Sequence, residues 1–148
     1  MNWSTRPVRP DDADQVAAHG HHGERDDAKR VLYAAWARPR IAAGTYLGWF
    51  ACDDCGVIAG AGAVLLDWGP TRANPCGQMA RIVNVYTEPG WRRRGIARAL
   101  LATVMTACEA RDVREFNLGA TTEARGLYAA LGFESYPAEM RRRVNAAR

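Results

Sequence analysis

Residues 85–101 read VYTEPGWRRRGIARALL, and the interpretation of the whole chain depends on this stretch. A β-prone run over residues 79–87 leads into a turn that contains Pro89, and a helical pattern follows it. A loop that enters a helix in this way presents successive backbone N–H groups, together with the positive end of the helix dipole. The sequence therefore predicts a phosphate or pyrophosphate site at residues 92–97.

The side chains of this loop also suit an anion. Gly95 has no Cβ, so the backbone can approach a ligand closely. Arg92, Arg93 and Arg94 can add charge-assisted hydrogen bonds to the same anion. The alternative is that the three arginines form an ordinary solvated basic surface.

Two other phosphate motifs do not fit the sequence. Gly90 and Gly95 have the glycine spacing of a P-loop, but Ile96 and Ala97 occupy the positions of its Lys and its Ser or Thr. The run GAG at residues 60–62 begins like a dinucleotide-binding fingerprint, but the third glycine is missing and the run lies inside an expected strand. Two glycines within a strand instead indicate a bulge or a close backbone neighbour.

Periodicity and turn residues predict the remaining elements of the chain. The N-terminal half is predicted to contain a strand at Val8, a helix capped by Asp11 or Asp12 and reaching His19, and a helix over 24–38. Three strands follow, over 45–52, 57–68 and 79–87, and then a helix lined by Ile96, Leu100, Val104 and Cys108. The remaining elements are a strand over 115–120, a helix over 121–131, and one or two strands within 133–144. This order indicates one α+β domain around a mixed sheet.

The composition is that of a folded domain. Of the 148 residues, 48% are apolar and 24% are charged, which is a globular rather than a disordered balance. No uncharged apolar run approaches the roughly 18 residues that span a bilayer, and residues 1–14 lack the apolar centre of a signal peptide. We therefore expect a cytoplasmic protein without a membrane partner, in which all the cysteines are free thiols.

The loop at residues 92–97 resembles the acetyl-CoA signature of the GNAT superfamily of N-acetyltransferases, which reads Q/R-x-x-G-x-G/A. Arg92, Gly95 and Ala97 match this signature. A second block resembles the family's A-x-x-L-Y-x-x-x-G-F segment through Ala124, Leu127, Tyr128, Leu131, Gly132 and Phe133. The two blocks follow one another in the family's order, and the resemblance is clear over residues 78–133.

The resemblance implies one GNAT-like α+β domain over residues 1–148, with a mixed, mostly antiparallel central sheet flanked by about four helices. It also implies an enzyme that moves the acetyl group of acetyl-CoA to a primary amine by direct transfer in a ternary complex. That route needs neither a metal nor a covalent acyl-enzyme. A homodimer is compatible with it.

The family pattern assigns roles to particular residues. Backbone N–H groups of residues 93–97 are expected to hold the pyrophosphate, and the backbone of Val85 and Thr87 is expected to pair with the pantetheine arm as an added strand. The Val85 N–H is expected to polarise the thioester carbonyl, and Tyr128 to protonate the departing thiolate. The cofactor-binding set is Val85, Tyr86, Thr87, Arg92, Arg93, Arg94, Gly95, Ile96, Ala97 and Tyr128.

The sequence departs from common family patterns at two positions. Many members carry Glu or Asp near the middle of the strand before the signature, where this chain has Asn84. Asn84 joins Val85 and Tyr128 in the expected catalytic set because its amide can orient a water, but an amide is a poor base, so the general base is unassigned. Thr121 stands where many members have Asn, which leaves the subfamily open.

Other readings stay open beside this one. The basic clusters also fit a nucleic-acid-binding module, although the chain lacks aromatic interleaving and a recognition-helix pattern. A family member that binds CoA without catalysis is a further alternative. Zinc is disfavoured, because Cys52 and Cys55 have no second pair at finger spacing, and His19, His21 and His22 fit a solvated helix end.

The acceptor has no motif of its own in this sequence. In the family, its pocket is built by the first two helices and the loop before the signature strand, here about residues 19–38 and 68–78. The acidic residues in and near these segments are Glu24, Asp26, Asp27 and Asp67. Carboxylates attract ammonium groups, so we expect a small cationic amine and no nucleic acid; ordinary solvent-facing charges would give the same pattern.

Overall fold

The computed structural model describes residues 2–23 and 25–145. In chain order the elements are β1 (Ser4–Pro7), η1 (Pro10–Asp12), α1 (Ala13–Gly20), α2 (Asp27–Ala43), β2 (Tyr46–Asp53), β3 (Gly56–Asp67), β4 (Gln78–Thr87), η2 (Pro89–Trp91), α3 (Ile96–Glu109), β5 (Glu115–Asn117) and α4 (Arg125–Ala130). Most of these elements coincide with those that periodicity predicts.

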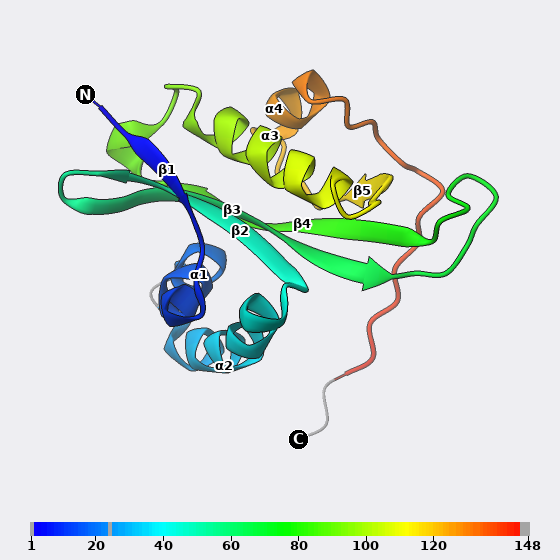
Figure 1. Cartoon of the computed structure of the whole chain (residues 1–148), viewed down its shortest axis with the longest axis horizontal. Coiled ribbons are helices and arrows are strands. Elements are labelled where there is room, and N and C mark those ends of the chain that lie inside the picture. The colour runs from blue at the N-terminus through cyan, green and yellow to red at the C-terminus, as the bar shows by residue number, and fades with distance from the viewer. Residues whose placement is uncertain (1, 24, 146–148) are drawn as a thin grey trace.

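The strands form one sheet in the order β1-β2-β3-β4-β5. All neighbours are antiparallel except β4 and β5, which run parallel. Helices α1 and α2 cover one face, and α3 and α4 cover the other (Figure 1). The expected α+β domain, with a mixed, mostly antiparallel central sheet flanked by about four helices, is confirmed, and the structure places these helices on both faces.

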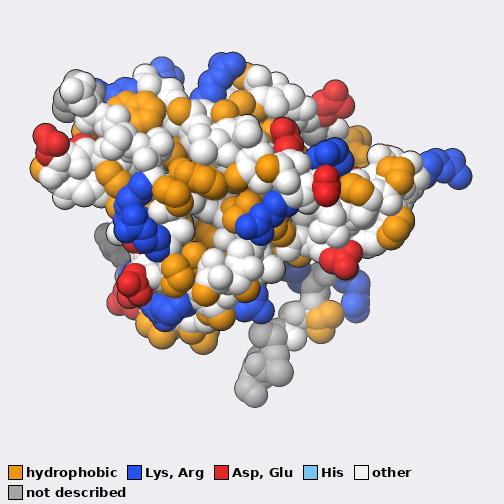
Figure 2. Space-filling view, viewed as in Figure 1, with side chains coloured by type: hydrophobic (Ala, Val, Ile, Leu, Met, Phe, Trp, Pro, Cys, Tyr) orange, Lys and Arg blue, Asp and Glu red, His pale blue; other side chains and the backbone are white. Residues whose placement is uncertain are grey.

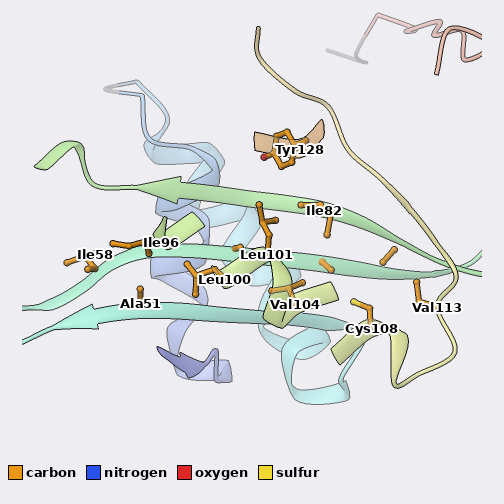
Figure 3. Close-up of a cluster of buried hydrophobic side chains, with 14 residues drawn as sticks. Ala51, Ile58, Ile82, Ile96, Leu100, Leu101, Val104, Cys108, Val113 and Tyr128 are labelled. Atoms are coloured by element: carbon orange, nitrogen blue, oxygen red, sulfur yellow. The ribbon is translucent and has the colours of Figure 1, made fainter. Parts of the chain in front are cut away.

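The main hydrophobic core lies between α3 and the sheet (Figure 3). Ile96, Leu100, Val104 and Cys108 recur at helical spacing, and all four are buried as the sequence predicts. They pack against small side chains of β2, β3 and β4, such as Ala59. This packing fixes the N-terminus of α3 beside the end of β4.

A second core lies on the opposite face, beneath α1 and α2. Val16, Tyr46 and Phe50 form its centre. Ala13, Ala17 and Ala34 lie between the two helices, and small side chains allow helices to approach closely. The C-terminal end of α1 is thereby held against the middle of the sheet.

The second helix does not stop at Pro39, so the expected end at residue 38 is wrong. The helix continues to Ala43 and ends at Gly44, which has a left-handed backbone (φ 77°). The Arg40 guanidinium donates to the Trp36 carbonyl at 2.8 Å in the turn that Pro39 disturbs, and it also lies over the Trp36 ring. The expected first residue, Glu24, lies outside the described residues.

Three other expected boundaries shift. The first strand precedes Val8, whose N–H still donates to Gly48 at 2.8 Å. The fifth strand stops at Asn117, three residues before its expected end at 120. Before α4, Thr121 closes a turn by accepting from the Ala124 N–H, so the helix begins later than expected.

The prediction of one or two strands within residues 133–144 is wrong. Residues 134–145 are exposed and form neither helix nor strand. Pro137 has no N–H to give to a ladder, and residues 141–143 are three successive arginines, which repel one another. Figure 1 shows this segment leaving α4 and passing to the α2 side of the sheet.

Candidate active site

Strands β4 and β5 pair over a short distance only. Their register joins Met79 to Glu115, Ala80 to Phe116 and Arg81 to Asn117. The Arg81 guanidinium donates to the Asn117 side chain at 3.0 Å where this pairing ends. Beyond it, within the described chain, the β5-facing edge of β4 has no strand partner. Backbone groups on that edge are free to pair with an extended ligand.

The same part of β4 contains a bulge. Gly62 pairs with Val83 and Gly60 with Tyr86, so Asn84 and Val85 together stand opposite one residue of β3. Asn84 has a left-handed backbone, with φ 56°. A bulge of this kind bends a strand and re-aims its backbone groups. The two glycines indicate a bulge or a close backbone neighbour; the structure shows a bulge beside them, and the extra residue belongs to β4.

The loop between β4 and α3 supplies free N–H groups. Gly95 caps α3 with a left-handed backbone (φ 77°), and Arg93 is also left-handed (φ 63°). Within the described chain, the N–H groups of residues 93–97 donate to no carbonyl. A run of free N–H groups at the start of a 14-residue helix is a ready-made anion site.

Two of the three arginines in this loop brace it. Arg92 Nε donates to the Thr87 carbonyl at 2.9 Å, and Arg94 Nη2 donates to the Gly90 carbonyl at 3.3 Å. Arg94 also lies 5.1 Å from the centre of the Trp91 ring. Arg93 is exposed and makes no hydrogen bond or ion pair with another described residue. The side chains of Arg92 and Arg94 thus stabilise the conformation of the loop and also give it positive charge.

Tyr128 lies on α4 and belongs to the core cluster beneath α3 (Figure 3). The residue is 8% exposed, and its ring packs edge-to-face with that of Phe133, with the ring centres 5.9 Å apart. Burial raises the pKa of its hydroxyl above the usual range. The hydroxyl makes no hydrogen bond to another described residue, so it remains available to a ligand.

The structure brings Asn84 together with two tyrosines that sequence reasoning missed. Asn84 Nδ2 donates to the Tyr33 hydroxyl at 3.0 Å and to the Tyr46 hydroxyl at 2.8 Å. Both tyrosines lie far from Asn84 along the chain, in α2 and β2. The sequence signal that points here is the pair of glycines in β3, because they leave room for neighbouring side chains.

The interpretation of the histidines as a solvated helix end is wrong for His19. Its ring is buried between Phe50 (centroids 5.4 Å apart) and Tyr86 (5.3 Å). A Cβ at Gly60 would lie 2.5 Å from His19 Nδ1, so glycine is needed there. Burial, followed by the charge of His22, lowers the pKa of His19 to about 4. His19 is therefore neutral near pH 7.

The other two histidines lie on the same side of the sheet. The His22 ring centre is 4.9 Å from that of Tyr86, and the His21 ring centre is 5.2 Å from that of Tyr33. His21 Nδ1 is buried and has no hydrogen-bond partner among the described residues. Aromatic and imidazole rings thus line the α1–α2 side of the bulge.

The described carboxylates of the expected acidic group do not gather at the bulge. Asp26 accepts from the Gly23 N–H at 3.0 Å and pairs with Lys29, and Asp27 pairs with Arg30. Asp67 stands opposite the first residue of β4, at the other end of that strand from Asn84. Glu24 lies outside the described residues.

Two further observations concern the described residues as a whole. Among them, no group of three or more His, Cys, Asp or Glu side chains is arranged to hold a metal ion. None of the helices described is both long enough and apolar enough to cross a membrane. Cys52, Cys55, Cys76 and Cys108 are free thiols, as expected.

Comparisons with known proteins bear on the fold. An acetyltransferase with acetyl-CoA from Clostridium acetobutylicum superposes with a TM-score of 0.87 at 22% identity, covering 96% of each chain. A GCN5-related N-acetyltransferase from Ralstonia eutropha gives a TM-score of 0.85 at 28% identity, over 97% of this chain and 99% of that one. The acetyltransferase AAC(6')-Iy gives 0.75 at 18% identity, over 99% and 100%. Among curated proteins, no relative matches the sequence.

The family comparison decides the identity. The profile of the acetyltransferase (GNAT) domain matches residues 13–144. The matched range contains both sequence blocks, the bulged strand and the helix that follows it. The resemblance found in the sequence is confirmed, and the chain belongs to the GNAT family of acetyltransferases, enzymes whose acyl donor is acetyl-CoA.

Proposed function

We propose that this chain transfers the acetyl group of acetyl-CoA directly to the primary amine of a small molecule. The observation that carries the proposal is the continuity of two features. The open edge of β4 suits an extended pantetheine arm, and it leads into the free N–H groups before α3, which suit a pyrophosphate. One linear ligand with both parts is CoA.

The donor is held mainly by backbone groups in this proposal. Arg93, Arg94, Gly95, Ile96 and Ala97 give their N–H groups to the pyrophosphate. Val85, Tyr86 and Thr87 contribute the strand edge along which the pantetheine arm lies. Arg92 adds positive charge while its side chain braces the Thr87 carbonyl.

The chemistry requires stabilisation of a negative charge and protonation of a leaving group. As the amine attacks the thioester carbonyl, charge develops on its oxygen, and the Val85 N–H in the bulge is the proposed donor to it. One such preorganised donor is worth about 3–4 kcal/mol of barrier. Tyr128, whose hydroxyl is protonated at neutral pH, gives its proton to the departing thiolate. The amine nitrogen loses one proton as the amide forms, and solvent carries that proton back to the Tyr128 oxygen.

The acceptor is proposed at the level of chemical class. The structure of AAC(6')-Iy contains a bisubstrate analogue made of CoA and acetylneamine, which joins the donor to a small amine. In this chain, the rings of Tyr86 and His22 lie on the α1–α2 side of the bulge, where we propose the acceptor, and aromatic faces attract ammonium groups. These rings support a small cationic amine better than the dispersed carboxylates do.

The first test of this proposal measures the binding of acetyl-CoA. Isothermal titration with acetyl-CoA should show binding to the native chain and none to Gly95→Glu, because the new carboxylate would occupy the pyrophosphate position. Gly69→Glu is the matched control, since Gly69 has a similar φ (88° against 77°) and equally open space. Equal affinity in both variants would remove the loop as the phosphate site.

The same preparation decides between the alternatives. Acetyl-CoA consumption is measured across cationic, neutral and anionic amines, with Asp26→Ala, Asp27→Ala and Asp67→Ala beside the native chain. Binding without turnover of any amine would identify a non-catalytic CoA binder.

Figure 2 shows acidic and basic side chains interspersed on the viewed face, which disfavours nucleic acid. A salt-dependent DNA titration tests that alternative, and sedimentation equilibrium tests the homodimer.

A further inference from the structure

The bulge in β4 depends on an unusual backbone conformation. Asn84 has φ 56°, which non-glycine residues adopt rarely and which Asn tolerates better than most. Strand residues on either side are extended. Something in the surroundings must therefore hold this one residue away from the extended conformation that its strand favours.

The Asn84 side chain is fixed from three elements. Its amide nitrogen has two hydrogens, and it donates one to Tyr33 in α2 and one to Tyr46 in β2. A Cβ added at Gly20, at the end of α1, would lie 2.0 Å from Asn84 Oδ1. The amide group is thus enclosed, and its nitrogen has no hydrogen left to orient a water.

The two tyrosines are themselves firmly placed. Tyr46 is 2% exposed, and a Cβ at Gly62 would come within 2.2 Å of its hydroxyl. Tyr33 is half-buried and packs between His21 and Trp36. Burial raises the pKa of both hydroxyls, so both stay neutral at physiological pH and can accept from the amide.

We propose that Tyr33 and Tyr46 are positioning residues that lock the Asn84 amide and thereby fix the direction of the Val85 N–H in the bulge. This inference rests on the proposed function, because it explains how the donor to the thioester oxygen is held in place. The backbone and side chain of Asn84 turn together, so a clamped amide prevents the bulge from relaxing to an extended strand. Neither tyrosine needs to touch the substrate.

The first test compares Tyr33→Phe, Tyr46→Phe and the double variant with Tyr136→Phe. Tyr136 is 69% exposed and lies outside the cluster, so it controls for loss of a hydroxyl. We expect kcat to fall roughly tenfold in each single variant and up to about a hundredfold in the double variant, while the Kd for acetyl-CoA is unchanged. A folded double variant with native kcat would overturn the proposal. If the buried Tyr46→Phe chain fails to fold, Tyr33→Phe alone decides.

The second test separates backbone from side chain. Residue 84 can still adopt φ 56° in Asn84→Gly, whereas alanine disfavours this conformation. We therefore expect a higher kcat in Asn84→Gly than in Asn84→Ala. In the Asn84→Gly background, Tyr46→Phe should cost little further activity, because its partner is gone. A full loss in that background would mean that Tyr46 acts without Asn84 and would overturn the proposal.

A third readout keeps this inference distinct from the proposed function. The amide resonance of Val85 is followed by NMR as acetyl-CoA is added to the native chain and to the Tyr33→Phe/Tyr46→Phe variant. We expect a shift in the native chain that is lost in the variant; the same shift in both would overturn the lock. If no amine is acetylated, the proposed function fails, and this measurement still decides the role of the tyrosines.

Discussion

At the scale of single residues, Tyr128 combines a buried ring with a hydroxyl that makes no hydrogen bond to any other residue that the structure describes. We expect Tyr128→Phe to lower kcat by about a hundredfold, because the leaving thiolate loses its acid, with little change in acetyl-CoA affinity. The measurement is steady-state acetyl transfer together with calorimetric binding. Tyr136→Phe is again the control. An undiminished kcat in Tyr128→Phe would reduce the residue to a packing role against Phe133.

Two glycines in β3 leave space for side chains that come from other elements of the fold. Gly60 leaves space for the His19 ring, and Gly62 leaves space for the Tyr46 hydroxyl. The spacing of the two glycines indicates a close neighbour within the strand. Which side chains approach them depends on α1 and β2, which meet β3 only in the folded sheet.

At the scale of elements, α2 carries a proline in its interior. Pro39 is exposed, so replacing it with Ala removes no buried contact. We expect Pro39→Ala to raise the free energy of unfolding by about 1–3 kcal/mol, because it restores a backbone donor and relieves the ring clash. Urea denaturation followed by circular dichroism measures this. Pro137→Ala, in a segment without helix or strand, should change little; a loss of stability in Pro39→Ala would contradict the argument.

The pairing of β4 with two different neighbours is the element-scale basis of the site. β3 pairs with β4 along most of its length, while β5 pairs with only its first part. The helix after β4 begins with a left-handed Gly95 and free N–H groups. A single strand, the loop after it and the first two residues of α3 therefore carry every proposed contact to the donor except Tyr128.

At the scale of the whole molecule, burial of His19 couples stability to pH. Its pKa is about 4 when folded against 6.5 for an exposed imidazole, so the unfolded chain binds more protons between these values. The contribution of the neutral His19 to the free energy of unfolding is fully present above about pH 6.5. It is lost as the pH falls towards 4, and the free energy of unfolding falls by at most about 3 kcal/mol. The measurement is the free energy of unfolding in urea over this range.

Two variants isolate that effect from the titration of carboxylates. His19→Gln carries no titratable group, so its stability should depend less on pH between 6.5 and 4 than that of the native chain. His22→Gln changes only the smaller of the two causes and should retain most of the slope. Equal slopes in the native chain and in His19→Gln would show that His19 does not carry the pH dependence.

The sequence by itself determined the features that depend on residues close along the chain. The face of α3, the succession of elements from β2 to α4 and the glycine that caps α3 follow from periodicity, turn residues and one short motif. Only the tertiary structure decided the surroundings of Asn84, because its partners stand 51 and 38 positions away. It also decided that His19 is buried and that α2 passes Pro39. Those outcomes depend on packing between distant segments, and no local pattern encodes which segments meet.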